Sequence, residues 1–388
     1  MKITLSLTSF TPEILDASYI WLCASRKNHP ANADVWDLRF HWSQEKVHLL
    51  QALRAGTYRL QPLRVTPRAV GEACVMWSAR DALVIHALTC LLAQHLPVHH
   101  TCEHVRGQGG GKQSARRVHH FLRNTNAPFV FRTDIRGYYA NIDKDRLYRQ
   151  LTTCITCPGM RSLLWQFLHY SVENGGNFHT PVKGIPRASS LSPLLAAFHL
   201  FHVDKTLTDI SGVRYARYMD DFIIITTTRH KLRRAVKILK QRLHEFGFVL
   251  HPDKTQLGRT QKGFDWMGLW FTDKGITAFA PRATEKHRLK LRQLYEHIRH
   301  LTPEGQAARM ALYLRLRAAS LLPLCTTNQA MENSMVYVSE MSVPSAIALK
   351  STTVASSDNG FAAATTANPT LTLVPWLAAS VLVVSIFW

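Results

Sequence analysis

Residues 214–228 read RYARYMDDFIIITTT. Two runs rich in β-branched and aromatic residues flank the adjacent acids Asp220 and Asp221, a pattern typical of a β-hairpin with both carboxylates at its tip. A solvated hairpin turn is one interpretation of such a pair. A metal site is the other, because adjacent charges between two apolar strands are costly to desolvate unless a cation compensates them.

A second β-rich stretch, FVFRTDI (129–135), places Asp134 at the end of a strand. Phosphoryl transfer from a nucleoside triphosphate to a hydroxyl group uses two divalent ions about 3.5–4 Å apart. Mg²⁺ prefers carboxylate oxygens and keeps several waters, so two or three carboxylates on rigid neighbouring strands are sufficient. The sequence therefore predicts Asp134, Asp220 and Asp221 as ligands of two Mg²⁺ ions, with Mn²⁺ as the alternative ion.

Further motifs extend this pattern over residues 58–271. In their order and spacing they resemble the fingers and palm of reverse transcriptases, of the bacterial group II intron-like and retron-like type. The matching segments are YRLQP (58–62), SARDALV (78–84), VRGQGGG (105–111), FRTDIRGYYANID (131–143), GIPRASSLSPLL (184–195), RYMDDF (217–222), HPDKT (251–255) and WMGLWF (266–271). The resemblance implies an α+β right-hand polymerase fold with fingers, a palm built on an antiparallel sheet and a short helical thumb.

The resemblance also assigns roles at the metal site. Asp134 and Asp220 match the family's metal ligands, and the backbone carbonyl of Ile135 supplies a further oxygen. Asp221 matches a weaker ligand or an electrostatic neighbour. Lys254 matches a lysine proposed to protonate the leaving pyrophosphate, with a phosphate or solvent contact as the alternative.

Three aromatic or basic residues match substrate-binding positions. Tyr139 lies where the family places an aromatic steric gate that excludes the 2′-hydroxyl of ribonucleotides; a core aromatic is the alternative, since Tyr138 and Tyr139 point to opposite faces if extended. Tyr218 matches the residue that packs against the primer end. Arg132 is expected either to contact phosphate or to form a salt bridge at the strand edge.

The second palm motif departs from the family pattern. Where the family usually has Pro-Gln-Gly, this chain has Pro186-Arg187-Ala188. We expect Arg187 to clamp a template phosphate, because a guanidinium binds phosphate bidentately. The finger segment is also irregular: Arg64, Arg68 and Arg80 are candidates for gripping the triphosphate, without a clear pair among them.

Hydrophobic periodicity predicts the remaining elements. We expect helices within 1–60 that end at Gly56, a helix over 76–96, a basic helix after the glycine-rich turn, a helix over 143–151, one long helix over 191–207, a basic amphipathic helix over 230–246, a strand over 264–271, and two basic helices over 284–322 broken near Thr302-Pro303. The expected domains are a helical extension (1–57), fingers and palm (58–279), thumb-like helices (280–325), a disordered linker (326–370) and a hydrophobic segment (371–388).

The charge of the chain indicates a polyanionic partner. Lys and Arg number 47 against 26 Asp and Glu, a net charge of +21, which favours nucleic acid or an anionic membrane surface. The basic helices over 230–246 and 284–300 are expected to line a template–primer groove. The seven cysteines form no framework; Cys154 and Cys157 are expected to be free thiols rather than zinc ligands, and no secretion signal is recognised. A cytoplasmic location is therefore expected.

The C-terminal segment differs in composition. Residues 331–388 contain one Lys and three acidic residues, and LTLVPWLAASVLVVSIFW (371–388) carries no charge. Eighteen residues lie at the lower limit for a membrane span. Membrane contact, a helix packed on the thumb and an acquired tail are the interpretations that remain open.

These features predict an RNA-directed DNA polymerase that binds an RNA template, a DNA or RNA primer and dNTPs, in a mobile element or a phage-defence system, with a non-coding RNA as an additional partner. An RNA-directed RNA polymerase is disfavoured by YMDD and by Tyr139. A degenerate polymerase fold acting as an RNA-binding or splicing-assistance module is the non-enzymatic alternative; the intact aspartates argue against it and Arg187-Ala188 argues for it.

Overall fold

The computed structural model describes residues 5–66, 74–105 and 107–321, all within one compact unit, Met1–Met331. Its helices are α1 (Pro12–Ser25), α2 (Asp34–Phe40), α3 (Trp42–Ala55), α4 (Ala79–Ala93), α5 (Gly110–Asn124), α6 (Tyr138–Asn141), α7 (Lys144–Cys154), α8 (Pro158–Leu168), α9 (Leu191–His199), α10 (Phe201–Thr208), α11 (Arg229–Glu245), α12 (Pro281–Ile298) and α13 (Pro303–Leu321). Three short 3₁₀ turns include Pro252–Lys254.

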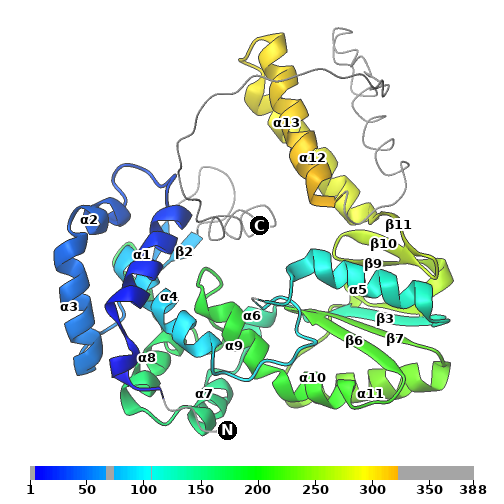
Figure 1. Ribbon diagram of the computed structural model, residues 1–388, viewed down its shortest axis with the longest axis horizontal. Helices are drawn as coiled ribbons and strands as arrows, with labels where there is room; N and C mark the ends of the chain where they lie inside the picture. Colours follow the sequence, from blue (N-terminus) through cyan, green and yellow to red (C-terminus); the bar gives the residue numbers. More distant parts are fainter. Residues whose placement is uncertain (1–4, 67–73, 106, 322–388) are drawn as a thin grey trace, which may run out of the picture. The chain divides into compact units, whose positions relative to one another are not determined.

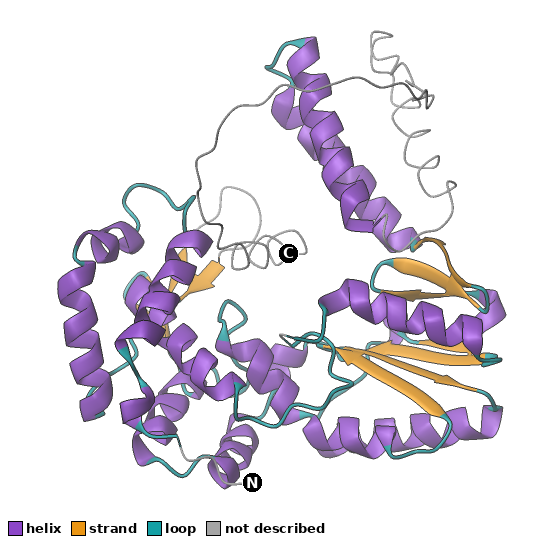
Figure 2. Cartoon of the chain, in the orientation of Figure 1, coloured by secondary structure: helices purple, strands orange, loops and turns teal. Residues whose placement is uncertain are grey.

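The strands form three small sheets (Figures 1 and 2). The central one has the order β6-β7-β3-β8, with β6 (Val213–Tyr218), β7 (Asp221–Thr226), β3 (Phe129–Asp134) and β8 (Gln256–Arg259). A second sheet joins β1 (Leu63–Thr66), β2 (Cys74–Met76), β4 (Val172–Asn174) and β5 (Asn177–His179). A third joins β9 (Phe264–Trp266), β10 (Leu269–Thr272) and β11 (Gly275–Phe279). Within the central sheet all neighbours are antiparallel.

Helices cover both faces of the central sheet, which explains why β7 is apolar from Phe222 to Ile225. Phe222 and Ile224 belong to the cluster that includes Leu232 and Leu239 of α11, whereas Ile223 and Ile225 belong to a second cluster with Val118 of α5 and other residues. Because successive side chains of a strand point to opposite faces, a strand covered on both sides must be apolar at every position. Figure 2 shows the sheet between these helices.

Many predicted boundaries are confirmed. Gly56, with φ of 71°, ends α3 in the left-handed conformation that favours glycine. Asp143 accepts a hydrogen bond from the backbone N–H of Arg146 and caps α7. The hairpin of β6 and β7 has Asp220 in its turn, with Asp221 as the first residue of β7. The predicted break between the last two helices falls between Ile298 and Pro303.

Two predictions about local structure are wrong. The long helix over 191–207 is interrupted at Leu200, which lies between α9 and α10 with φ of −99° and ψ of 13°. The strand over 264–271 is two strands joined by Met267 and Gly268, both with positive φ, as a two-residue hairpin turn requires. Tyr138 and Tyr139 do not sit on an extended strand; both belong to α6 and both are buried.

Several expectations concern residues outside the described ranges. These are the linker (326–370), the hydrophobic segment (371–388) and Arg68. Within the described part of the chain, no helix combines the length and the apolar character needed to cross a membrane. Cys154 and Cys157 form no disulfide and are partly buried.

Acid is expected to destabilise the fold through His199, a fully buried residue of α9 whose Nδ1 lies 2.6 Å from Oε1 of Gln150. Burial, and secondarily Arg146, lower the pKa of His199 to about 3, against about 6.5 in an unfolded chain. The unfolded state therefore takes up the proton first, and stability falls as the pH drops from about 6.5 towards 3. At pH 5 this residue alone should remove about 2 kcal/mol of unfolding free energy.

Urea titrations at pH 7 and pH 5 measure this effect. His199→Asn should lose less stability on acidification than the parent protein, since it removes the group whose pKa changes on folding. His202→Asn, an exposed neighbour on α10, is the matched control and should behave as the parent does. Equal pH dependence in all three proteins would contradict the prediction.

Candidate active site

Three carboxylates meet at one edge of the central sheet. Asp134 is the last residue of β3 and lies directly opposite Asp221, the first residue of β7. Asp220 occupies the adjoining hairpin turn. One oxygen from each of the three side chains lies within 4.8 Å of the others. Within the described ranges, this is the one group of three or more Asp, Glu, His or Cys side chains that lie close enough together to hold a metal ion.

The backbone around these residues is tied by hydrogen bonds. The N–H of Ile135 donates to the Asp220 carbonyl at 3.1 Å, and the N–H of His251 donates to the Asp134 carbonyl at 2.7 Å. Ile135 forms an isolated antiparallel bridge with Leu250. Neither of the two hydrogen bonds uses the carbonyl of Ile135, the oxygen that the family resemblance offers as a further metal ligand.

Two cations compensate two of the three carboxylates. Lys254 places its Nζ 2.6 Å from Oδ2 of Asp134. Arg132, which is buried, places Nη2 2.8 Å from Oδ1 of Asp221. Asp220 has no ion pair within the described ranges. The site therefore keeps an excess of negative charge at Asp220.

Burial, together with repulsion between the carboxylates, raises the pKa values of the turn carboxyls. Burial, then repulsion from Asp134 and Asp221, raises the pKa of Asp220 to about 7. Burial also raises the pKa of Asp221 to about 6, although the Arg132 guanidinium opposes that shift. Partly buried carboxylates that repel one another are the donor set that a hard divalent cation stabilises. The residues present therefore fit Mg²⁺ or Mn²⁺, held by Asp134, Asp220 and Asp221.

Tyr139 lies beside this carboxylate group. Its side chain is 7% exposed. Burial is the main cause that raises the pKa of Tyr139, and the negative charge of Asp220 is the second. The Tyr139 carbonyl accepts a hydrogen bond from the N–H of Ile185 at 2.9 Å. Gly184 makes this approach feasible: with φ of 89°, a Cβ there would lie 2.9 Å from the carbonyl oxygens of Tyr139 and Ala140.

Tyr138 has a different environment from its neighbour. It is 1% exposed and its hydroxyl donates to the carbonyl of Ala196 at 2.7 Å. Tyr138 is therefore a core residue, whereas Tyr139, also buried, interacts electrostatically with Asp220. Steric gating by Tyr139 remains a prediction.

The other residues singled out from sequence fall into two groups. Arg132 and Lys254 are engaged in ion pairs with the carboxylates, and for Arg132 this is the salt-bridge alternative. Arg187 is exposed, and Tyr218 is partly buried with its ring beside Gly111 at the start of α5. These positions leave Arg187 free to reach a ligand and place Tyr218 next to the turn.

Arg64 and Arg80, the two described candidates for gripping a triphosphate, do not form a basic cluster with each other. Arg64 and Arg80 line a pocket of about 260 Å³, but Asp34, Asp37 and Glu45 line it too. Arg80 forms an ion pair with Glu45. The pocket is therefore of mixed charge.

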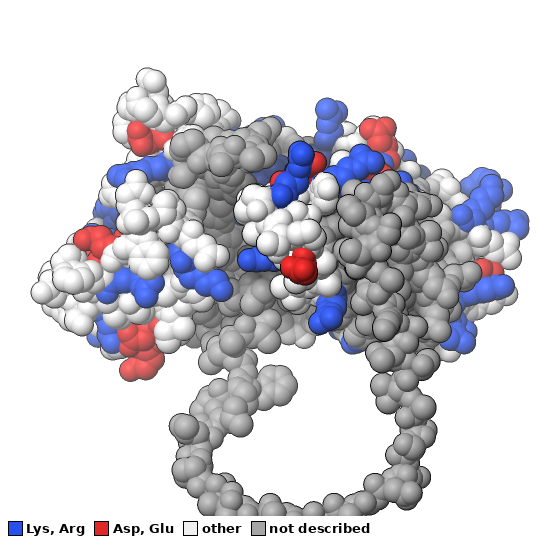
Figure 3. Space-filling model, turned by 90° about the horizontal axis from the view of Figure 1, so that it is seen from above, with Lys and Arg blue, Asp and Glu red and all other residues white. Residues whose placement is uncertain are grey.

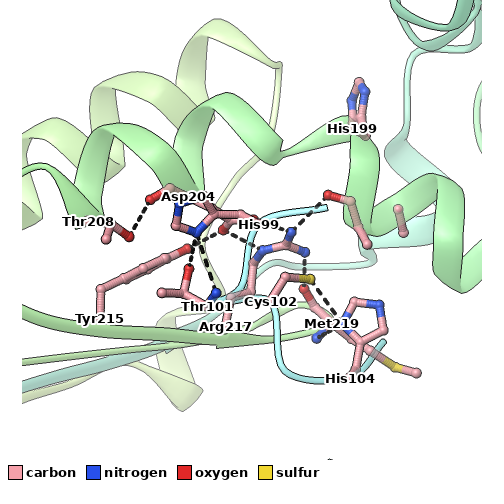
Figure 4. A network of polar contacts seen from close by, with 12 residues as sticks. His99, Thr101, Cys102, His104, His199, Asp204, Thr208, Tyr215, Arg217 and Met219 are labelled. Atoms are coloured by element: carbon pink, nitrogen blue, oxygen red, sulfur yellow. Dashed lines mark hydrogen bonds and ion pairs between the residues drawn. The ribbon is translucent and has the colours of Figure 1, made fainter. Parts of the chain in front are cut away.

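Sequence reasoning missed a buried polar network behind the turn (Figure 4). Arg217 and Asp204 form an ion pair in which both side chains are 0% exposed. His104 accepts a hydrogen bond from the backbone N–H of Met219 at 3.0 Å. Burial lowers the pKa of His104 to about 3, so its ring is neutral. No local pattern could have revealed these contacts, because His104 and Met219 are 115 residues apart.

An antiparallel palm sheet with helices on both faces and three carboxylates at its edge defines the class of right-hand nucleic-acid polymerases. Residues 81–271 match the family model described as reverse transcriptase (RNA-dependent DNA polymerase). This part of the chain is therefore a reverse transcriptase domain.

Similar proteins include the group II intron-encoded protein LtrA of Lactococcus lactis subsp. cremoris, which is 26% identical over 214 residues, or 52% of this chain and 34% of that protein. Protein YkfC of Escherichia coli is 23% identical over 268 residues, 57% of this chain and 69% of that protein. Among solved structures, apo telomerase from Candida tropicalis, truncated from its C-terminal domain, aligns with a TM-score of 0.43 and 13% identity, covering 61% of this chain and 60% of that one. The chain thus spans about a third of the length of LtrA.

Proposed function

We propose that this chain extends a primer with dNTPs on an RNA template by two-metal-ion phosphoryl transfer. The convergence of Asp134, Asp220 and Asp221 across β3 and β7 is the observation that carries the proposal. Bound Mg²⁺ ions would lower the pKa of the primer hydroxyl and stabilise the charge of the triphosphate. Asp134 and Asp220 hold these ions, with Asp221 and the Ile135 carbonyl as secondary oxygens.

The side chains around the carboxylates then act on the substrates. Lys254, whose side chain is 39% exposed beside Asp134, is placed to donate a proton to the leaving pyrophosphate. Tyr139 excludes a 2′-hydroxyl, Tyr218 packs against the primer end, and exposed Arg187 contacts a template phosphate. Arg132 orients Asp221 through its ion pair.

One assay tests the polymerase and its template choice together. Purified protein is incubated with poly(rA)/oligo(dT), Mg²⁺, and either dTTP or UTP. Extension with dTTP and not with UTP is expected. Extension with UTP alone would indicate an RNA-directed RNA polymerase. Tight template–primer binding with no extension by either nucleotide would support the RNA-binding or splicing-assistance module, for which Arg187-Ala188 is the motivating feature.

The biological setting is also part of this proposal. The similarity to the group II intron-encoded protein LtrA supports a role in a mobile element, and a phage-defence system is the other setting. A non-coding RNA is an additional partner that a strongly basic chain would bind. A cytoplasmic location, with membrane contact through 371–388 as the further option, completes the proposal.

Template–primer affinity is expected to fall steeply with salt, because bound Lys and Arg displace counterions from phosphates. Lys and Arg side chains outnumber Asp and Glu side chains on the face drawn in Figure 3. On α12, Lys286 and Arg292 are exposed. Their double replacement by Ala should reduce the slope of log affinity against log salt by about 2.

Fluorescence anisotropy of a labelled template–primer, measured from low to physiological salt, gives these slopes. The control is Lys27→Ala with Arg149→Ala, which removes the same charge from exposed positions on the N-terminal side of the chain and on α7. That control should keep the parental slope. A flat salt dependence of the parent protein would contradict the groove assignment of the basic helices.

A further inference from the structure

Met219, between Tyr218 and Asp220, has an unusual backbone conformation. Its φ is 56°, and only Met219 and Met267 among the described non-glycine residues have positive φ. A side chain with a Cβ disfavours the left-handed region, so such a conformation persists only where surrounding contacts impose it. Because Asp220 is the next residue, the conformation of Met219 sets the direction of the Asp220 carboxylate.

Two side chains impose this conformation. The backbone N–H of Met219 donates to Nδ1 of His104 at 3.0 Å, and the carbonyl of Met219 accepts from Nη1 of Arg217 at 3.0 Å. The next carbonyl, that of Asp220, accepts from the N–H of Ile135 at 3.1 Å. Three polar groups of the turn backbone are therefore held. Figure 4 shows His104 and Arg217 converging on Met219.

Strand pairing places His104 beside the turn. Cys102 forms a parallel bridge with Arg217 on β6, in which the N–H of Arg217 donates to the Thr101 carbonyl at 2.9 Å and the N–H of Glu103 donates to the Arg217 carbonyl at 2.8 Å. In a parallel register, two residues further on, His104 comes opposite Met219.

The remaining nitrogen of His104 fixes the orientation of its ring. Nε2 lies 3.1 Å from the carbonyl of Pro193 on α9. Since Nδ1 accepts from Met219, Nε2 carries the proton and donates to Pro193. The imidazole therefore links α9 to the turn, and each nitrogen has a separate role that a substitution can remove alone.

Arg217 is held on its other sides by the buried network. Its Nε donates to Oδ1 of Asp204 at 2.7 Å, its Nη2 lies 2.5 Å from Oδ2 of the same residue, and Nη2 also donates to the Ala197 carbonyl at 3.1 Å. The Tyr215 hydroxyl donates to Oδ1 of Asp204 at 2.6 Å. The positive charge of Arg217 is thus paired with Asp204. Its role at the turn is to hold a hydrogen-bond donor, Nη1, in a fixed position at the Met219 carbonyl.

We propose that His104 and Arg217 are positioning residues that hold Met219 in the left-handed conformation and so direct the Asp220 carboxylate towards Asp134 and Asp221. The inference rests on the proposed function, since it assigns these residues to the same site. Neither side chain needs to touch a substrate. Losing either contact would let Met219 relax and turn Asp220 away from the other two carboxylates.

Three substitutions of His104 separate this role from a general packing role. Asn keeps an acceptor at the position of Nδ1 and loses the contact with Pro193. Gln keeps a donor at the position of Nε2 and loses the contact with Met219. Leu loses both. His99→Leu is the matched control: His99 lies in the same loop and its Nδ1 contacts the Thr101 hydroxyl at 2.8 Å.

Two measurements are made on each purified full-length protein. Mn²⁺ affinity, followed by the EPR signal of the free ion, should weaken about tenfold in the Leu and Gln variants. The kcat for dTTP incorporation should fall about 10²-fold in these two variants, because a displaced carboxylate no longer meets its partners. The Asn variant should recover most of both losses, and His99→Leu should match the parent in both.

The outcomes decide the proposal. Recovery by Gln instead of Asn would assign His104 to packing against α9 and overturn its positioning role, as would parental Mn²⁺ affinity in the Leu variant. Arg217→Lys, which keeps a positive charge near Asp204 but not the forked geometry, should weaken Mn²⁺ binding similarly; a folded Lys variant with parental affinity would remove Arg217 from the proposal. A parent protein that binds Mn²⁺ but never extends a primer would defeat the proposed function, while the Mn²⁺ titrations would still test the positioning role.

Discussion

Asp220→Asn is expected to abolish primer extension, lowering kcat by about 10³-fold or more, because a neutral amide replaces a carboxylate that holds the divalent ions. Nucleic-acid binding should survive, since Asp220 lies at the tip of a hairpin and has no ion pair within the described ranges. The substitution should also raise the melting temperature in EDTA. Burial and the charges of Asp134 and Asp221 raise the pKa of Asp220 to about 7, so its ionised form destabilises the fold without metal.

The stability effect at Asp221 serves as a comparison. Asp221→Asn should raise the melting temperature in EDTA less than Asp220→Asn does, because burial raises the pKa of Asp221 only to about 6 and the substitution also weakens the ion pair with Arg132. Asp253→Asn, an exposed acid two residues after His251, is the control and should change neither activity nor stability. Primer-extension rates, template–primer anisotropy and thermal melts with and without Mg²⁺ provide the measurements. A folded Asp220→Asn protein that retains more than a few per cent of activity would remove Asp220 from the site.

Tyr139→Ala is expected to reduce discrimination against ribonucleotides by on the order of 10²-fold. The aromatic ring lies beside the carboxylates and is almost fully buried, so its removal opens space where a 2′-hydroxyl would otherwise collide. The ratio of kcat/KM for dTTP to that for UTP on poly(rA)/oligo(dT) measures the effect.

Two conservative variants control for loss of packing. Tyr139→Phe keeps the ring and should keep the parental ratio. Tyr138→Phe removes only the hydroxyl that donates to Ala196 in the core, and it should lower stability without changing the ratio. Unchanged sugar selection in Tyr139→Ala would mean that Tyr139 is a core aromatic, or that the gate lies elsewhere.

Local sequence patterns were sufficient to predict the strands and the carboxylates at the strand ends, because these features depend on residues that are close together in the chain. The run FIIIT predicts a strand of a β-hairpin, and β7 is that strand, packed between α5 and α11. Asp134, Asp220 and Asp221 could be paired from sequence because each lies at a strand end, and antiparallel strands bring their ends together. The same reasoning failed at Leu200, where a continuous apolar pattern concealed the end of one helix and the start of the next.

Strand and helix periodicity and the placement of charge at strand ends are local properties, so the order of the residues predicted the α+β class, most elements and the three carboxylates. The cation that each carboxylate meets became visible only in the folded chain: Lys254 with Asp134, and Arg132 with Asp221. The same is true of the contacts that His104 and Arg217 make with Met219. The reason is physical: these contacts depend on strand register between segments far apart in the chain, and a shift of one residue would turn each side chain to the other face.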